Sequence, residues 1–481
     1  MYLLIMVRTK LKTFGFVIVL FLSFGIGLNQ LISQPKHTKQ STPDDGKVDM
    51  QQMMQQRLQR MQNLKKQRGG FNSFEDALAN PTSIKNLVLR NDSLTTLSPR
   101  IKELTELERL DISFNLLTDL PNELAELQNL QELRLNKNNF SKIPAVIFKL
   151  KKLQILEIAE NNITSVGSEI ISMASLRKLV LNNNKISNIN FDWSKLTELK
   201  DINLSHNQIN AVPESFSNMR SLSLLDLSAN SLSTINPKLF DSKSVNILKL
   251  DGNKLKSLPK EISKMTELRH LSIGQNSLDS LSDEICNLPN LNILDLSETH
   301  IKSLPKNLSK LSSLRTLHFS NNDLKQLPPM ICELSSISEL HINDNSLSSL
   351  PASIENMKNL KVISLKNNQF TDYPNSLGKI ENLRQVDLTG NKISNISNSI
   401  SKNSKLQTLN LSHNQIVNLP KELVELTELK TLTLTDNQLQ ALPAGMESMK
   451  NLRVIILKGN NISDSTKESI KGSLPNTRLI F

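Results

Sequence analysis

Apolar residues along most of the chain recur in one fixed arrangement, L-x-x-L-x-L-x-x-N-x-L. Copies begin every 23 residues from Ile84 to Leu452, which gives seventeen repeats without an insertion. The L-x-L portion alternates apolar and polar positions and predicts a short strand with one buried face. The second half, L-P-x-x-L-x-x-L, is bulkier and has near-helical spacing, as in residues 419–426. One small unit used many times predicts a stacked solenoid.

This pattern resembles the leucine-rich repeat superfamily in its 23-residue LPxxLxxL type, and it covers about four-fifths of the chain. Exported bacterial proteins, plant intracellular Ras-group proteins and Ras-pathway scaffolds carry similar repeats. The resemblance implies an α/β repeat solenoid, a curved horseshoe with a parallel β-sheet on its concave face. Short helical, 3-10 or extended segments would form the wider convex face.

The ninth position of the repeat is Asn in fifteen copies, and Asp92 and Thr299 are the exceptions. An Asn side chain both donates and accepts hydrogen bonds. In this family it turns inward and bonds the backbone of neighbouring turns, which satisfies polar groups that would otherwise be buried unpaired. We interpret Thr299 as a structural substitution whose hydroxyl replaces part of that bonding.

The pattern divides the chain into five segments. They are a signal peptide or N-terminal membrane anchor (1–33), a polar, partly helical spacer (34–70), an N-terminal cap helix (71–83), the repeat array (84–463), and a C-terminal cap helix and strand (464–481). Caps are expected because an open end of a solenoid exposes core and strand edge.

Residues 14–28 form an apolar run preceded by Arg8, Lys10 and Lys12, which is typical of a secretory signal. The run is short for a spanning helix, so a cleaved signal and an uncleaved anchor both stay open, as does a start at Met6. We expect an exported protein of a bacterial-type cell envelope or a secreted one, rather than a cytoplasmic one. Residues 50–67 predict a spacer helix that is solvated, self-associating or bound to anionic lipid.

The net charge of +11 belongs mostly to the N-terminus. Residues 1–70 hold 11 Lys and Arg against 3 Asp and Glu, which leaves 46 against 43 for the rest. A nucleic-acid-binding domain should carry its basic excess on the folded surface, so we expect no nucleic-acid partner. Cys286 and Cys332 are two repeats apart, about 10 Å by strand spacing, and are expected to be packed thiols beyond disulfide reach.

The concave sheet, at positions 3, 5, 7 and 8 of each repeat, is the expected binding surface. Strands about 4.8 Å apart would make a face on the order of 80 Å long, which suits a macromolecule. Exposed aliphatic residues with a polar border predict an interface in repeats seven to twelve. The residues predicted to bind the ligand are Leu224, Asp226, Ile247, Lys249, His270, Ser272, Ile293, Asp295, His318 and His341.

Asp295, His318 and His341 occupy position 5 of consecutive repeats. They suggest either a divalent-metal or pH-responsive site, or a polar face on which Asp295 pairs loosely with His318. The main prediction is a non-catalytic scaffold that binds a protein, is monomeric, and has no cofactor or metal. Self-association or membrane attachment through the N-terminal segments stays open. A cytoplasmic small-GTPase regulator and a metal-dependent enzyme at Asp295, His318 and His341 are the alternatives.

Overall fold

The computed structural model describes residues 70–71, 73–301 and 304–481. Every described residue belongs to one compact unit, which lies within Gln62–Phe481. The segment predicted as a signal or anchor and residues 34–69 of the predicted spacer lie outside the described residues. Among the described helices, none is both long and apolar enough to cross a membrane.

All strands among the described residues belong to one nineteen-stranded sheet, in which each strand pairs in parallel with its neighbour along the chain. Strands β2 to β18 occupy positions 3–5 of the seventeen repeats, so equivalent residues lie side by side. The strands are β1 (Gly70–Phe71), β2 (Asn86–Val88), β3 (Arg109–Asp111), β4 (Glu132–Arg134), β5 (Ile155–Glu157), β6 (Lys178–Val180), β7 (Asp201–Asn203), β8 (Leu224–Asp226), β9 (Ile247–Lys249), β10 (His270–Ser272), β11 (Ile293–Asp295), β12 (Thr316–His318), β13 (Glu339–His341), β14 (Val362–Ser364), β15 (Gln385–Asp387), β16 (Thr408–Asn410), β17 (Thr431–Thr433), β18 (Val454–Ile456) and β19 (Arg478–Ile480).

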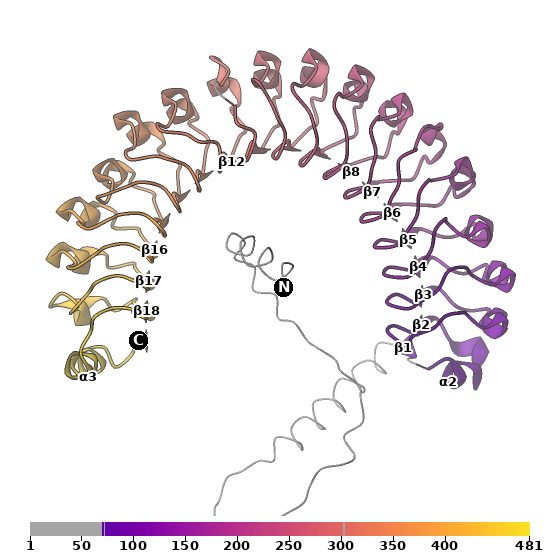
Figure 1. Cartoon of the computed structure of the whole chain (residues 1–481), viewed down its shortest axis with the longest axis horizontal. Coiled ribbons are helices and arrows are strands. Elements are labelled where there is room, and N and C mark those ends of the chain that lie inside the picture. The colour runs from indigo at the N-terminus through magenta and orange to yellow at the C-terminus, as the bar shows by residue number, and fades with distance from the viewer. Residues whose placement is uncertain (1–69, 72, 302–303) are drawn as a thin grey trace, which may run out of the picture. The chain divides into compact units, whose positions relative to one another are not determined.

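Short 3-10 helices form the outer wall of the repeat unit, while the strands line its inner side (Figure 1). The wall is wider than the row of strands, so the stack curves with the sheet on the concave face. This confirms the predicted curved solenoid. The 3-10 helices are Pro81–Ser83, Pro99–Glu103, Asn122–Glu126, Ala145–Lys149, Ser168–Ser172, Trp193–Lys195, Glu214–Asn218, Pro237–Asp241, Lys260–Lys264, Asp283–Asn287, Leu308–Lys310, Pro329–Glu333, Ala352–Asn356, Asn375–Lys379, Asn398–Lys402, Lys421–Glu425 and Met446–Ser448.

The core is a column of apolar side chains from positions 1, 4 and 6 of every repeat, aliphatic except for Phe319, and none of them is more than 3% exposed. Full burial of a Leu side chain contributes about 1.5–3 kcal/mol. The outer wall adds aromatic contacts, such as Trp193 stacked on Phe191 with ring centroids 4.4 Å apart. Cys286 and Cys332 are buried and free in the same wall, as predicted. Burial raises the pKa of Cys286 to about 11.

An α-helix lies near each end of the sheet. Helix α2 (Phe74–Leu78) begins after Ser73, whose side chain accepts a hydrogen bond from the Asp76 amide, and it buries Ala77. Helix α3 (Asp464–Ser473) begins after Ser463 and buries Ile470, and β19 then pairs with β18. A Ser at the residue before the first turn satisfies an otherwise unpaired amide there.

Position-nine asparagines connect each repeat to the one before it. Asn253 Nδ2 donates to the carbonyl of Leu227 in the preceding repeat at 3.0 Å, and its Oδ1 accepts from the amide of Leu232 at 3.0 Å. All fifteen asparagines donate to the position-six carbonyl of the preceding repeat. This ladder satisfies backbone groups inside the stack.

Thr299 breaks the ladder. Its side chain is fully buried, which confirms the inward orientation, and its Oγ1 donates to Leu296 O of the same repeat at 2.8 Å. Within the described residues no side-chain bond from Thr299 reaches repeat nine. Instead Oδ1 of Asn322, in repeat eleven, accepts from the amides of Thr299 at 3.0 Å and His300 at 2.9 Å. His300 and Asp323 take left-handed φ values of 57° and 56°, so this turn is reshaped.

Replacing Asn253 by Ala should destabilise the protein by about 1–3 kcal/mol, because the buried amide of Leu232 loses its acceptor. Thr299→Val should cost less than about 1 kcal/mol, since Leu296 O still receives Asn322 Nδ2 at 2.9 Å. Urea-induced unfolding followed by circular dichroism measures both. Equal losses would contradict the assigned role of the asparagine.

Candidate functional site

Strands β8 to β13 bring the ten predicted residues onto neighbouring strands of one sheet. Position 3 runs Leu224, Ile247, His270, Ile293 across β8–β11, and position 5 runs Asp226, Lys249, Ser272, Asp295, His318, His341 across β8–β13. Side chains two residues apart on a strand point to the same face. Both rows therefore share the concave face, and every member except Ser272 is partly exposed.

An apolar stripe, defined as Leu224, Ile247 and Ile293, crosses this surface with His270 between its second and third members. The stripe is partly exposed. Asp226, Lys249 and Asp295 follow on the same strands. An apolar centre with a charged border is the composition of protein interfaces.

Ser272 does not present its hydroxyl as we expected. It is 6% exposed because its Oγ donates to the carboxylate of Asp251 at position 7 of the preceding repeat. Asp251 also accepts from the Gly274 amide at 3.0 Å and from Ser228 Oγ at 3.3 Å. Burial raises the pKa of the Asp251 carboxyl. Ser272 therefore orients a carboxylate within the surface, and it was wrongly placed among exposed residues.

The predicted pairing of Asp295 with His318 is also wrong. The His318 ring stacks on that of His341, with centroids 4.6 Å apart and an interplanar angle of 11°. Asp295 Oδ1 accepts from the Ser297 amide at 2.9 Å, and no ion pair joins it to His318 in the described part of the chain. His341 Nε2 lies 3.8 Å from a carboxylate oxygen of Glu339. Stacking between imidazoles, which parallel register favours, takes the place of the expected pairing.

The electrostatic environment favours the neutral imidazole at His341 and at His270. Burial, with the neighbouring charge of His318, lowers the pKa of His341. Burial, with the charge of Lys249, lowers the pKa of His270. Among the described residues, no group of three or more His, Cys, Asp or Glu side chains is placed to hold a metal ion. Asp295, His318 and His341 lie on adjacent strands but do not converge.

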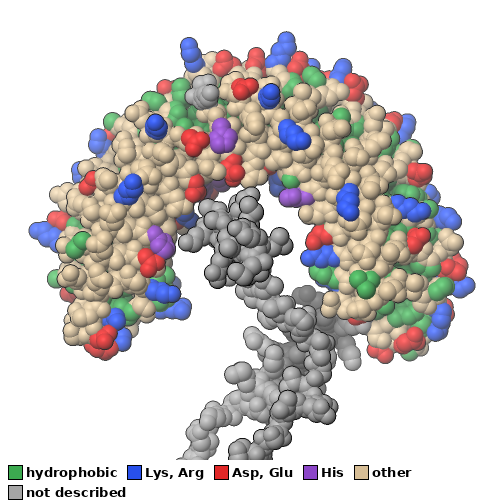
Figure 2. Space-filling model, viewed as in Figure 1, with side chains coloured by type: hydrophobic (Ala, Val, Ile, Leu, Met, Phe, Trp, Pro, Cys, Tyr) green, Lys and Arg blue, Asp and Glu red, His purple; other side chains and the backbone are tan. Residues whose placement is uncertain are grey.

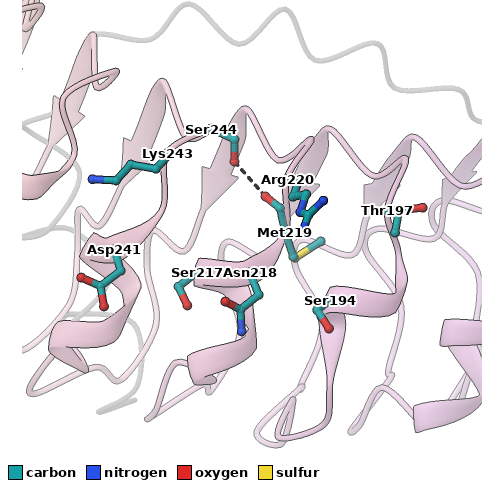
Figure 3. A pocket seen from close by; sticks show the side chains of 9 residues that line it. All are labelled: Ser194, Thr197, Ser217, Asn218, Met219, Arg220, Asp241, Lys243 and Ser244. Carbon is teal, nitrogen blue, oxygen red and sulfur yellow. Dashed lines mark hydrogen bonds between the residues drawn. The ribbon is translucent and has the colours of Figure 1, made fainter.

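Several cavities among the described residues open along the edge where the chain enters the strands. One cavity, of about 660 Å³, is lined by residues that lie between Ser194 and Ser244 in the sequence, and Ser244 Oγ donates to Met219 O there at 2.8 Å (Figure 3). A second, of about 290 Å³, includes Arg177 and Glu198. A third, of about 730 Å³, adjoins the apolar stripe and includes Arg269 and Arg315. Sequence reasoning missed these arginines because it considered only positions 3, 5, 7 and 8.

Basic and acidic side chains are interspersed on the side of the repeat unit seen in Figure 2. Several form pairs between neighbouring repeats, such as His300 with Asp323 and His413 with Asp436, each with 3.2 Å between nitrogen and oxygen. Exposed pairs of this kind contribute little to stability. They also leave no broad area of one charge on this side.

Family models match the chain over most of the repeat array. The leucine-rich repeat model matches 128–186, 174–232, 220–278, 243–301 and 381–439, and the leucine-rich repeat region model matches 274–392. A leucine-rich repeat protein of Leptospira interrogans is similar in structure, with a TM-score of 0.68 and 31% identity over 86% of this chain and 99% of that one. The chain belongs to the leucine-rich repeat family.

Other similar structures have ligands bound. The ectodomain of the plant membrane receptor kinase GASSHO1/SCHENGEN3 from Arabidopsis thaliana, in complex with CASPARIAN STRIP INTEGRITY FACTOR 2, has a TM-score of 0.58 and 29% identity over 84% of this chain and 53% of that one. The TLR13–ssRNA13 complex has a TM-score of 0.56 and 23% identity over 82% and 65%, which shows the fold alone. No curated protein matches the chain in sequence. Because one similar structure is a complex with RNA, the expectation that this protein has no nucleic-acid partner stays a prediction.

Acidification should lower the melting temperature through His341. Its folded pKa lies below its unfolded value, so in the window between them the unfolded chain binds more protons and stability falls as pH falls. Between about pH 7.5 and about pH 5.5, a range that spans the usual histidine pKa, the loss should be larger in the wild type than in His341→Gln. His413→Gln, at an exposed position, is the control and should behave like the wild type. Identical profiles for all three would contradict the assignment.

Proposed function

We propose that the protein is a non-catalytic scaffold that holds a protein ligand on its concave face at repeats seven to twelve. The observation that carries the proposal is the apolar stripe on β8, β9 and β11, which is partly exposed and bordered by Asp226, Lys249 and Asp295. Membership of a family whose fold commonly mediates protein–protein interaction supports it.

Rigidity of the sheet explains how such a surface would bind. Each strand from β8 to β13 is fixed by pairing on both sides and by a buried core, so the side chains are ordered before the ligand arrives. A preformed surface avoids much of the entropic cost of ordering on association. Specificity then depends on the side chains at positions 3 and 5, which range from aliphatic to charged along the array, while the core positions stay apolar.

The double change Leu224→Asp with Ile247→Asp should weaken capture of a protein partner by at least about tenfold, because it places carboxylates in the apolar centre. The full chain, immobilised, is compared with the variant in pull-downs and then by titration of the captured partner. Ile155→Asp with Val454→Asp is the matched control, since both residues occupy position 3, partly exposed, in distant repeats. A partner that survives the first change, or is lost equally with the control, would refute this location.

We also propose that the protein is exported, from the apolar run at 14–28 and the basic residues before it. N-terminal sequencing and fractionation of the native protein should find it outside the cytoplasm, either shortened near residue 33 or retained in a membrane. An intact chain in the soluble cytoplasmic fraction would contradict export and would favour the small-GTPase alternative, which otherwise stays a prediction.

A further inference from the structure

The cavity of about 730 Å³ beside the apolar stripe differs from its neighbours in charge. Its lining includes Arg269 and Arg315, the amides of Asn290 and Asn292, and Ile247 and Ile293 of the stripe, and it contains no carboxylate. The cavities of about 660 Å³ and about 290 Å³ on this edge each include one, Asp241 or Glu198. In the first, Asp241 Oδ1 is 2.8 Å from Lys264 Nζ. Each of those cavities therefore has one carboxylate beside two basic side chains, whereas Arg269 and Arg315 share a lining without any carboxylate.

Arg177 and Arg269 show how the difference arises. Both occupy position 2 of their repeats, and each lines a cavity together with the residue 21 positions later. For Arg177 that residue is Glu198, 3.8 Å from the guanidinium, whereas for Arg269 it is Asn290. Within the described part of the chain, no hydrogen bond or ion pair holds the Arg269 guanidinium. An Arg in this setting keeps all five of its donors for a ligand.

Arg315 is held in place without losing its charge. Its Nη1 donates to the backbone carbonyl of Ser336 at 3.2 Å, which leaves the remaining donors of the guanidinium available. It lies two repeats from Arg269, about 10 Å by strand spacing, with Asn292 between them. Arg side chains are long enough for both guanidinium groups to approach one bound anion from opposite sides.

The charge extends along the whole edge. Position 2 of the seventeen repeats holds nine Lys or Arg and a single acidic residue, Glu108. From repeat nine onward the basic members are Arg269, Arg315, Lys361, Arg384, Lys430 and Arg453. The near neutrality of the repeat array as a whole conceals this row of basic side chains, because most acidic residues lie at other positions of the repeat, including position 23 of the same edge, where Glu198 lies.

We propose that the Arg269–Arg315 cavity binds an oxyanion carried by an acidic segment of the protein ligand, which lies with its apolar residues on the stripe. This subsite rests on the proposed function. Guanidinium groups recognise carboxylate and phosphate with paired hydrogen bonds. An acidic peptide fits better than single-stranded nucleic acid, because the cavity has no Phe, Tyr or Trp on which bases would stack. The ligand would then run along the direction of the strands, from the basic edge toward Asp251 and Asp295.

Fluorescein-labelled octaglutamate, titrated with the full chain and followed by anisotropy, tests the cavity without knowledge of the partner. Arg269→Gln with Arg315→Gln should weaken binding at least about tenfold, with an unchanged melting temperature. Arg177→Gln, the matched control, should change affinity less than about twofold, because its charge is already paired with Glu198. A phosphoserine octapeptide and inorganic phosphate distinguish carboxylate from phosphate as the preferred oxyanion.

Several outcomes would overturn the proposal. They are no binding of octaglutamate by the wild type, equal losses in Arg177→Gln and the double variant, or tighter binding of a labelled oligonucleotide through the same arginines. The response of the captured partner to the two double variants distinguishes a failure of this proposal from a failure of the proposed concave-face function. A partner lost with Leu224→Asp and Ile247→Asp but kept by the double arginine variant overturns the subsite alone. Octaglutamate bound through the arginines, with a partner indifferent to the stripe, overturns the concave location alone.

Discussion

Each repeat must reverse the chain at the end of its strand, and the amides and carbonyls of that reversal face the interior of the stack. An Asn side chain at position nine satisfies them because it carries donors and an acceptor a short distance apart. The bond it makes to the position-six carbonyl of the preceding repeat fixes the register of one turn on the next. Since strand pairing and core packing both require that register, the parallel sheet depends on this residue.

A constant register has a direct consequence for the concave surface. Residues at one repeat position form straight rows at strand spacing, so any chemistry there comes from neighbours in a row or from neighbouring rows. Rows explain the stacking of His318 on His341 and the apolar stripe. They also explain why His and Asp on successive strands do not converge on a metal, since rows hold side chains parallel.

The sequence was sufficient for features that depend on the backbone period alone. The strands at positions 3–5, the buried aliphatic column and the inward Thr299 all follow from a 23-residue repeat whose polar positions are known. It was not sufficient for features that depend on rotamers and contacts between repeats. Ser272 has the same repeat position as exposed residues, and it is buried because Asp251 on the neighbouring turn accepts its hydrogen bond.

The candidate site shows the same division. Placement of the ten predicted residues on one face follows from periodicity. The arginine cavity does not, because it is formed by positions 22, 23 and 2 of several repeats, which lie outside the strand motif. A comparison of position 2 with the residue 21 places later could have revealed it, since Glu198 pairs with Arg177 there and Asn290 has the equivalent position for Arg269.

Thr299 gives the array a seam. Repeat proteins hold together through contacts between neighbouring repeats only. Within the described residues, a position-nine side chain bridges every boundary between repeats except the one between repeats nine and ten. Nine repeats precede it and eight follow. His270 and Ile293 lie on opposite sides of this seam within the candidate site. A ligand that contacts both would act as a clamp, so occupancy of the site and cohesion of the two halves would rise and fall together.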